Sequence, residues 1–336
     1  MKNSTLLIRS LLVIIALTGF AHFFYYNYDL NGEDNLISFF SKTLQWENVE
    51  YWFYILNDLS LVYIIIPFFF IELIRHAFLR RLSKDLILDS IANIITFGGF
   101  FLIEIILGIL AITKLYYWIY NNLSLPHLDI NWATIIACIL LADFAYYWEH
   151  RTMHRIGIGW ATHTVHHSSP HFNMSVAYRF GPLDAILPII FSLPIVMLGF
   201  DPILVLLSEV FVQVFQTLLH TEIIGKLIKP VEFIFNTPSH HRVHHGSNRQ
   251  YWDKNYGGIL IIWDRFLGTF EPEKEKVVYG ISEPLNSINP IKVFFHGITR
   301  LRDKLSKVSG IGNKLRVFIK PPDWMPKDKS KNDNLE

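Results

Sequence analysis

Histidines at ligand spacing are the residues of this chain best suited to chemistry. Nine of its 15 histidines fall in three short arrays. The arrays read His150-x3-His154, His163-x2-His166-His167 and His240-His241-x2-His244-His245. Residues at i, i+3 and i+4 of a helix share a face, so each array would present a stripe of imidazoles. Neutral imidazole is the commonest protein ligand for metals, and the arrays therefore predict metal binding.

The number of histidines favours two metal ions over one. A single ion takes roughly four to six ligands, fewer than the arrays offer. Iron, copper and zinc all suit imidazole, but a mononuclear zinc hydrolase would leave most of these side chains unused. Two irons would use the whole set and leave positions for dioxygen. We therefore predict an oxygen-activating centre with two iron ions.

Three residues close to the arrays also need a role. His220 ends an apolar stretch, where a histidine is costly and functional by default, so we predict it as a further ligand. Either His240 or His241 could face the metals, and both are included. Asp143 lies two helical turns before His150 and could hold the second N–H of a ligand, or it could be purely structural. The predicted ligands are His150, His154, His163, His166, His167, His220, His240, His241, His244 and His245.

The composition indicates a membrane protein. The chain is 51% hydrophobic and only 18% charged, whereas a soluble domain has about 25% charged residues. A membrane-spanning helix needs about 20 apolar residues. The sequence predicts six spans, at Leu6–Phe24, Phe53–Ile74, Leu86–Ile112, Trp132–Trp148, Leu183–Phe200 and Pro202–Leu219. The last two are short, so four spans and a re-entrant hairpin are the alternative. We expect the first to be an uncleaved anchor.

The expected fold class is all-α, an integral-membrane helix bundle with a cytosolic, histidine-rich helical cap. Long unbroken apolar runs exclude a barrel, and backbone groups in lipid must be satisfied within helices. Residues 1–131 are expected to be membrane scaffold, 132–285 the catalytic domain and 286–336 a polar C-terminal tail.

The distribution of basic residues predicts the orientation. The loop Arg75–Lys84 carries four Lys and Arg residues, whereas the loops Asn27–Glu50 and Lys114–Ile130 carry one Lys each. By the positive-inside rule, both chain ends and the histidine arrays lie on the cytoplasmic side. The single cysteine, Cys138, excludes an internal disulfide, as expected for a reducing compartment. A net charge of +1 gives no indication of a nucleic-acid partner.

The motifs resemble those of the fatty acid hydroxylase (sterol desaturase) superfamily of integral-membrane diiron enzymes. The matching strings are Asp143-x2-Tyr146-Tyr147-x2-His150-Arg151-x2-His154, Trp160-x2-His163-x2-His166-His167-Ser168, Thr237-Pro238-x-His240-His241-Arg242-Val243-His244-His245-Gly246, Asn255-Tyr256-Gly257 and Trp263-Asp264-Arg265-x2-Gly268-Thr269-Phe270. They cover roughly residues 140–285 and are specific as a set. The resemblance implies two irons, dioxygen as co-substrate, and a lipid substrate that enters from the bilayer.

Within this superfamily the chain is most similar to the alkylglycerol monooxygenase family. The similar strings are His220-Thr221-Glu222-Ile223-Ile224, Asp253-Lys254-Asn255-Tyr256, Tyr279-Gly280-Ile281 and the run from Asn236 to Gly246. This resemblance implies tetrahydrobiopterin-dependent hydroxylation of the alkyl carbon beside an ether oxygen, which releases a fatty aldehyde and a glycerol derivative. The chain has Arg155 where that family has an acidic residue, and Pro170-His171 where it has Glu-Asp. The electron donor, a pterin or a redox protein, therefore stays open.

Other functions remain as alternatives. The same centre could hydroxylate or desaturate sterols, sphingoid bases, fatty acyl chains or carotenoids. A metal transporter or sensor is a distant alternative, because transporters usually place their ligands within the spans. A bis-histidine haem protein would need histidines that face each other on adjacent spans.

Overall fold

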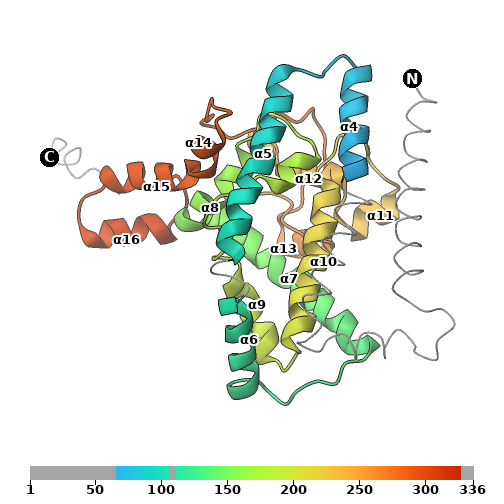
Figure 1. The fold of residues 1–336 in the computed structure, drawn as a ribbon, viewed down its shortest axis with the longest axis vertical. Coiled ribbons are helices and arrows are strands. Elements are labelled where there is room, and N and C mark those ends of the chain that lie inside the picture. The colour runs from blue at the N-terminus through green and yellow to red at the C-terminus, as the bar shows by residue number, and fades with distance from the viewer. Residues whose placement is uncertain (1–65, 106–109, 327–336) are drawn as a thin grey trace.

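The computed structural model describes residues 66–105 and 110–326, and the regular secondary structure of these residues is helical (Figure 1). They contain no β-strand, only two isolated bridges. The all-α prediction is therefore confirmed for the described part of the chain. Its α-helices are α4 (Ile66–Phe78), α5 (Lys84–Ile103), α6 (Leu110–Asn122), α7 (Trp132–Arg155), α8 (Gly157–His167), α9 (Ile189–Met197), α10 (Pro202–Leu219), α11 (Lys229–Ile234), α12 (Pro238–His244), α13 (Ile262–Leu267), α14 (Pro290–Phe294), α15 (His296–Ser306) and α16 (Ile311–Ile319). Two short 3-10 helices, η4 (Met174–Tyr178) and η5 (Arg249–Tyr251), complete the set.

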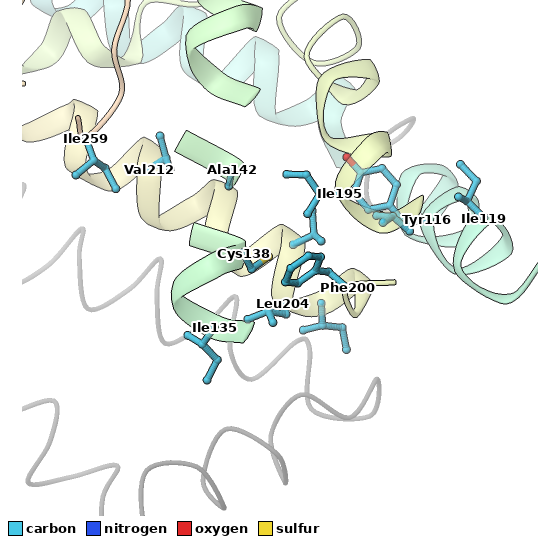
Figure 2. Packing of buried hydrophobic residues seen from close by; sticks show 13 residues of the cluster. Tyr116, Ile119, Ile135, Cys138, Ala142, Ile195, Phe200, Leu204, Val212 and Ile259 are labelled. Atoms are coloured by element: carbon cyan, nitrogen blue, oxygen red, sulfur yellow. The ribbon is translucent and has the colours of Figure 1, made fainter. Parts of the chain in front are cut away.

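The main hydrophobic core lies where α7 packs against α9 and α10, which in turn contact α6 (Figure 2). On α7, buried Ile135, Cys138 and Ala142 recur at spacings of three and four residues, which places them on one helix face. Buried Leu204 and Val212 of α10 belong to the same cluster. This packing fixes α7, whose far end carries the first histidine array.

The ends of α7 are set by local chemistry. The Asn131 side chain accepts hydrogen bonds from the backbone N–H groups of Ala133 and Thr134 and completes a capping box. At the other end the chain turns sharply into α8. A Cβ at Gly159 would lie 2.8 Å from the Thr152 carbonyl oxygen, so this close approach of the two helices requires glycine. The corner brings the first two histidine arrays together.

Two of the described helices, α5 and α10, are long and apolar enough to cross a membrane. On α5, the side chains of Ile87, Ile91, Ile94 and Ile95 are 41–52% exposed. A row of exposed isoleucines at helical spacing is what lipid contact would favour. α7 is longer, but Asp143 makes its second half more polar.

The predicted span Leu86–Ile112 coincides with α5 up to Ile103, and α5 is one of the two candidate membrane spans. α6 begins at Leu110, and residues 106–109 lie outside the described part of the chain. The stretch Leu183–Phe200 is wrong as a continuous span. Its only regular helix is α9, nine residues with a proline inside it, which rises about 14 Å against a hydrocarbon layer of about 30 Å. The span Leu6–Phe24 and most of Phe53–Ile74 lie outside the described residues, so the count of six stays a prediction.

Buried polar contacts connect the first helices to the histidine-bearing part. Glu72 on α4 accepts hydrogen bonds from the Met174 backbone N–H at 2.7 Å and from the Thr221 hydroxyl. On α5, Asp89 pairs with the Arg179 guanidinium at 3.0 Å, and both side chains are 1% exposed. Removing one partner of such a buried pair leaves an uncompensated charge. The segments after α8 and α10 are therefore held firmly against α4 and α5.

The described C-terminal region contains three helices. α14, α15 and α16 follow one another, and the last two form a hairpin beside α8 (Figure 1). A Cβ at Gly297 would lie 1.6 Å from the Ala161 carbonyl oxygen, and the Gly157 N–H donates to the Lys320 carbonyl at 2.9 Å. Glycines therefore allow α15 and α16 to pack closely on α8, and the division of the chain into scaffold, catalytic domain and tail stays a prediction.

Candidate metal centre

Nine histidines gather in two adjacent clusters inside the helical bundle. The first cluster consists of His150, His154, His163, His167 and His244. The second consists of His166, His220, His241 and His245. Within each cluster the ligand atoms lie within 4.8 Å of one another, and all nine side chains except His163 are buried. Two groups of converging imidazoles are what two metal ions would need.

α8 contributes histidines to both clusters. His163 and His167 are four residues apart and face the first cluster, whereas His166 faces the second. Consecutive residues point about 100° apart around a helix axis, so His166 and His167 diverge. The spacing x2 followed by two adjacent histidines therefore lets one helix hold both sites.

α12 repeats this arrangement in reverse. His241 and His245, four residues apart, face the second cluster, and His244 between them faces the first. The remaining histidines come from α7, which gives His150 and His154 to the first cluster, and from the end of α10, where His220 joins the second. Each cluster thus combines side chains from three segments of the chain.

The distances between Nε2 atoms fit a shared ion. Neighbouring pairs are His150–His163 at 3.0 Å, His167–His244 at 3.0 Å, His166–His220 at 3.1 Å, His220–His241 at 2.9 Å and His241–His245 at 3.2 Å. Two nitrogens at right angles around an ion about 2.1 Å away lie about 3.0 Å apart, and at a tetrahedral angle about 3.4 Å apart. The spacing is therefore closer to five- or six-coordinate geometry than to a tetrahedral site.

Backbone carbonyls decide which ring nitrogen faces each cluster. The contacts at Nδ1 are His150 to the Tyr256 carbonyl at 3.0 Å, His244 to the Lys254 carbonyl at 3.0 Å and His220 to the Gln216 carbonyl at 2.9 Å. A carbonyl can only accept, so Nδ1 of each ring carries the proton. The Nε2 lone pair then points to the other histidines, as in most metal-binding histidines.

The clusters are held in the neutral state that metal binding requires. Burial lowers the pKa of His244 to about 4 and that of His220 to about 3. Burial, followed by repulsion from neighbouring imidazoles, lowers the pKa of His154 well below its usual value. The buried Nε2 of His154 has no hydrogen-bond partner among the described residues. An orphaned lone pair inside such a cluster fits a ligand that bonds to a metal.

The structure does not bring His240 into either cluster, in contrast to the prediction. Its Nε2 lies 3.0 Å from the Glu232 carboxylate, and its backbone carbonyl accepts from the Asn255 amide at 3.0 Å. A one-residue offset from His241 turns its side chain about 100° around α12, away from the clusters. His240 therefore anchors α12 to α11.

Of the two predicted roles of Asp143, the structure favours the structural one, because its hydrogen bonds within the described residues come from a loop and not from a histidine. It accepts hydrogen bonds from the Ile259 N–H, from the Leu260 N–H at 3.1 Å and from the Trp263 indole N–H at 2.8 Å. A buried carboxylate needs several donors, and this loop supplies three. Since the same loop contains the carbonyl of Tyr256, Asp143 acts on the first cluster indirectly.

A second carboxylate holds the other side of that loop and was not among the predicted site residues. Asp264 accepts from the Tyr256 N–H at 2.8 Å, the Gly257 N–H at 2.7 Å and the Thr269 hydroxyl at 2.6 Å. Its side chain is completely buried. In the sequence, Asp264 stands out only as part of the string Trp263-Asp264-Arg265. Its spacing from the histidines does not predict that it lies near the metal site.

Comparisons with known proteins agree with this site. Residues 135–269 match the family model "Fatty acid hydroxylase", and this range contains all nine clustered histidines. Human alkylglycerol monooxygenase is 44% identical over 213 residues, which cover 63% of this chain and 47% of the relative. The enzyme of the same name from Caenorhabditis elegans is 38% identical, with 63% of this chain and 44% of the relative covered. An ornithine lipid hydroxylase of Rhizobium tropici is 33% identical over 40% of this chain and 41% of its own length.

The chain thus spans about half the length of the curated relatives it matches. No solved structure matches it. The family match and the two clusters coincide, so the part of the chain that carries the histidine clusters is the part that is similar to the fatty acid hydroxylase family.

Proposed function

We propose that this chain is an integral-membrane diiron oxygenase that hydroxylates a C–H bond of a lipid. The observation that carries the proposal is the division of nine histidines into two adjacent, buried clusters. A single structural metal would need about four ligands and would leave the second cluster without a purpose.

The donor set supports iron. The first cluster has five imidazoles and the second has four, and no cysteine or carboxylate belongs to either. Around an ion with about six positions this leaves room for dioxygen at both. Iron bound there would supply oxygen activation and the oxidising power for C–H cleavage. The chain's own contribution is to hold nine Nε2 or Nδ1 lone pairs inward, keep the rings neutral and exclude water.

We further propose an ether lipid as the substrate, attacked at the carbon beside the ether oxygen. Support comes from relatives named alkylglycerol monooxygenase at 38–44% identity. Tetrahydrobiopterin is the proposed electron donor, with a redox protein as the alternative. Residues 1–131 would be membrane scaffold and 132–285 the catalytic domain, in a multi-pass protein whose active site faces the cytoplasm. The basic loop between α4 and α5 supports this orientation.

Cluster geometry argues against a haem protein. A porphyrin between two histidines separates their coordinating nitrogens by roughly twice a metal–nitrogen distance, about 4 Å. The facing Nε2 atoms of His150 and His163 are 3.0 Å apart, and those of His167 and His244 are equally close. These pairs leave no room for a macrocycle.

The proposed substrate is tested by expressing the protein in cells fed with a 1-alkylglycerol, with and without tetrahydrobiopterin. Mass spectrometry of fatty aldehyde and the corresponding acid is the readout. We expect both products to depend on the pterin, to be absent with the His244→Ala variant and to persist with His240→Gln. Unchanged ether lipid together with a newly hydroxylated sterol, sphingoid or acyl lipid would favour the alternative substrate classes, in line with the more distant sterol desaturase relatives.

A further inference from the structure

A charged cavity of about 220 Å³ lies beside the second cluster. It is formed by the end of α4 and the loop after it, the segment after α10, α12, and residues 273–279. Its charged lining residues are Arg75, Arg81, Arg242, Lys276, Glu222 and Glu273. Four basic and two acidic side chains leave an excess of positive charge. Neither the metal clusters nor the lipid chain needs such a cavity.

The acidic residues of the cavity already have partners. Glu273 forms a two-point ion pair with Arg242 at 2.9 and 2.8 Å, and Arg242 also donates to the Thr221 carbonyl at 3.0 Å. Glu222 accepts a hydrogen bond from the Tyr279 hydroxyl at 3.1 Å. Arg242 is 6% exposed, so one wall of the cavity is rigid and close to charge-neutral.

The remaining basic residues have no such partners. Within the described part of the chain, the side chains of Arg75, Arg81 and Lys276 form no ion pair or hydrogen bond, although all three line the cavity. Arginine presents a planar set of N–H donors that matches the oxygens of a phosphate group. A doubly charged phosphate would balance the excess of basic residues, whereas a carboxylate would balance half of it.

Aromatic rings connect the cavity to the second cluster. Tyr279, which lines the cavity, stacks on Phe172 with ring centroids 4.8 Å apart. Phe172 in turn lies 5.1 Å from the ring of His245 and 5.7 Å from that of His220. In a 1-alkylglycerol 3-phosphate, roughly 7 Å of extended chain separates the phosphorus from the carbon beside the ether oxygen. Two ring contacts in series therefore link the cavity lining to the second cluster, over a separation of the same order as the length of the polar end of such a lipid.

We propose that this cavity is a phosphate-binding subsite, with Arg75 and Arg81 as its main phosphate ligands. In its fullest form, which rests on the proposed lipid hydroxylation, the phosphate belongs to the headgroup of the lipid that is oxidised. A free phosphate ion has the same chemistry, and the two sources are separated by experiment.

The first experiment measures binding without turnover. Inorganic phosphate or glycerol 3-phosphate is titrated into the purified full-length protein in detergent, and thermal unfolding is followed at constant ionic strength against chloride. We expect saturable stabilisation of the wild type, and binding about tenfold or more weaker in the double variant Arg75→Gln/Arg81→Gln. The matched control is Arg80→Gln, which removes an exposed arginine of the same loop that does not line the cavity. Equal stabilisation of the wild type and the double variant, or none of either, would overturn the subsite.

The second experiment identifies the source of the phosphate. Turnover of a 1-alkylglycerol 3-phosphate is compared with that of the uncharged 1-alkylglycerol. The ratio of their kcat/KM values should fall about tenfold in the double variant, through a higher KM for the phosphorylated lipid, and stay constant in Arg80→Gln. A constant ratio in the double variant would overturn the headgroup assignment and leave free phosphate as the ligand. Absence of turnover of either lipid would contradict the proposed function, while the binding experiment would still decide the subsite.

Discussion

The backbone carbonyl of Tyr256 lies 3.0 Å from Nδ1 of His150, across 106 residues of sequence. This contact fixes the tautomer of His150 and turns its Nε2 to the first cluster. The carbonyl belongs to a loop held by two buried carboxylates, Asp143 and Asp264. The first cluster is thus positioned by residues that never touch it, and this relationship can be tested.

Replacing Asp143 by Asn should destabilise the protein and weaken metal binding at the first cluster. The asparagine amide has one acceptor oxygen, whereas the N–H donors of the loop share two carboxylate oxygens in the wild type. The amide's own N–H groups would also face the N–H groups of the loop. One or two lost hydrogen bonds to a buried carboxylate correspond to roughly 1–3 kcal/mol. Thermal unfolding and iron content would be measured together. The control Asp303→Asn, an exposed residue, should stay within about 0.5 kcal/mol. Wild-type stability and iron content in the Asp143 variant would contradict this role.

His244→Ala and His240→Gln should behave differently although they lie on the same short helix. His244 belongs to the first cluster, so its removal should release metal from that cluster and abolish oxygenase activity. His240 contacts Glu232 instead, and a glutamine can still donate to that carboxylate. Iron per chain, measured by inductively coupled plasma mass spectrometry, should fall by about one equivalent in the first variant only. Equal losses in both would argue that the effect is one of folding.

Substitutions at Glu72 should weaken the packing of α4 against the histidine-bearing part of the chain, alanine more than glutamine. Alanine leaves the Met174 N–H and the Thr221 hydroxyl without their acceptor, at a cost of roughly 1–3 kcal/mol for each buried group. Glutamine keeps one acceptor oxygen and should cost less. Limited trypsin digestion at Arg80 and Arg81, in the loop after α4, reports the loosening. Identical digestion of wild type, Glu72→Gln and Glu72→Ala would contradict the proposed connection.

The metal-free protein should lose stability as the pH falls below about 6.5. Burial lowers the folded-state pKa of His244 to about 4 and of His220 to about 3, whereas unfolded histidine titrates near 6.5. The unfolded chain therefore binds more protons in this range, so the stability present above pH 6.5 is lost progressively towards pH 4. Thermal unfolding of the metal-free protein at successive pH values measures this. A transition temperature independent of pH between 6.5 and 5 would contradict neutral, buried imidazoles.

Local spacing in the sequence accounts for much of the site. The i, i+3 and i+4 separations predict that each array lies on a helix, and the count predicts two ions. His220 could be predicted from the cost of a histidine at the end of an apolar stretch. The division of α8 and α12 between two clusters could not, because it depends on the angle at which each helix enters the site.

The predictions that the structure does not support also failed because they depend on contacts between segments that are distant in the sequence. His240 and His241 are indistinguishable by spacing, and only the carboxylate of Glu232 on a neighbouring helix separates them. Asp143 stands at the helical position of a ligand partner but meets backbone N–H groups that come from over a hundred residues later in the chain. Apolar runs predict membrane spans, but they do not show where a helix such as α9 begins.

The most direct test of the two-metal account is a crystal structure of the iron-loaded protein with anomalous diffraction at the iron edge. The account predicts two anomalous peaks, one among His150, His154, His163, His167 and His244 and one among His166, His220, His241 and His245. A single peak, or a peak bound by His240, would contradict it.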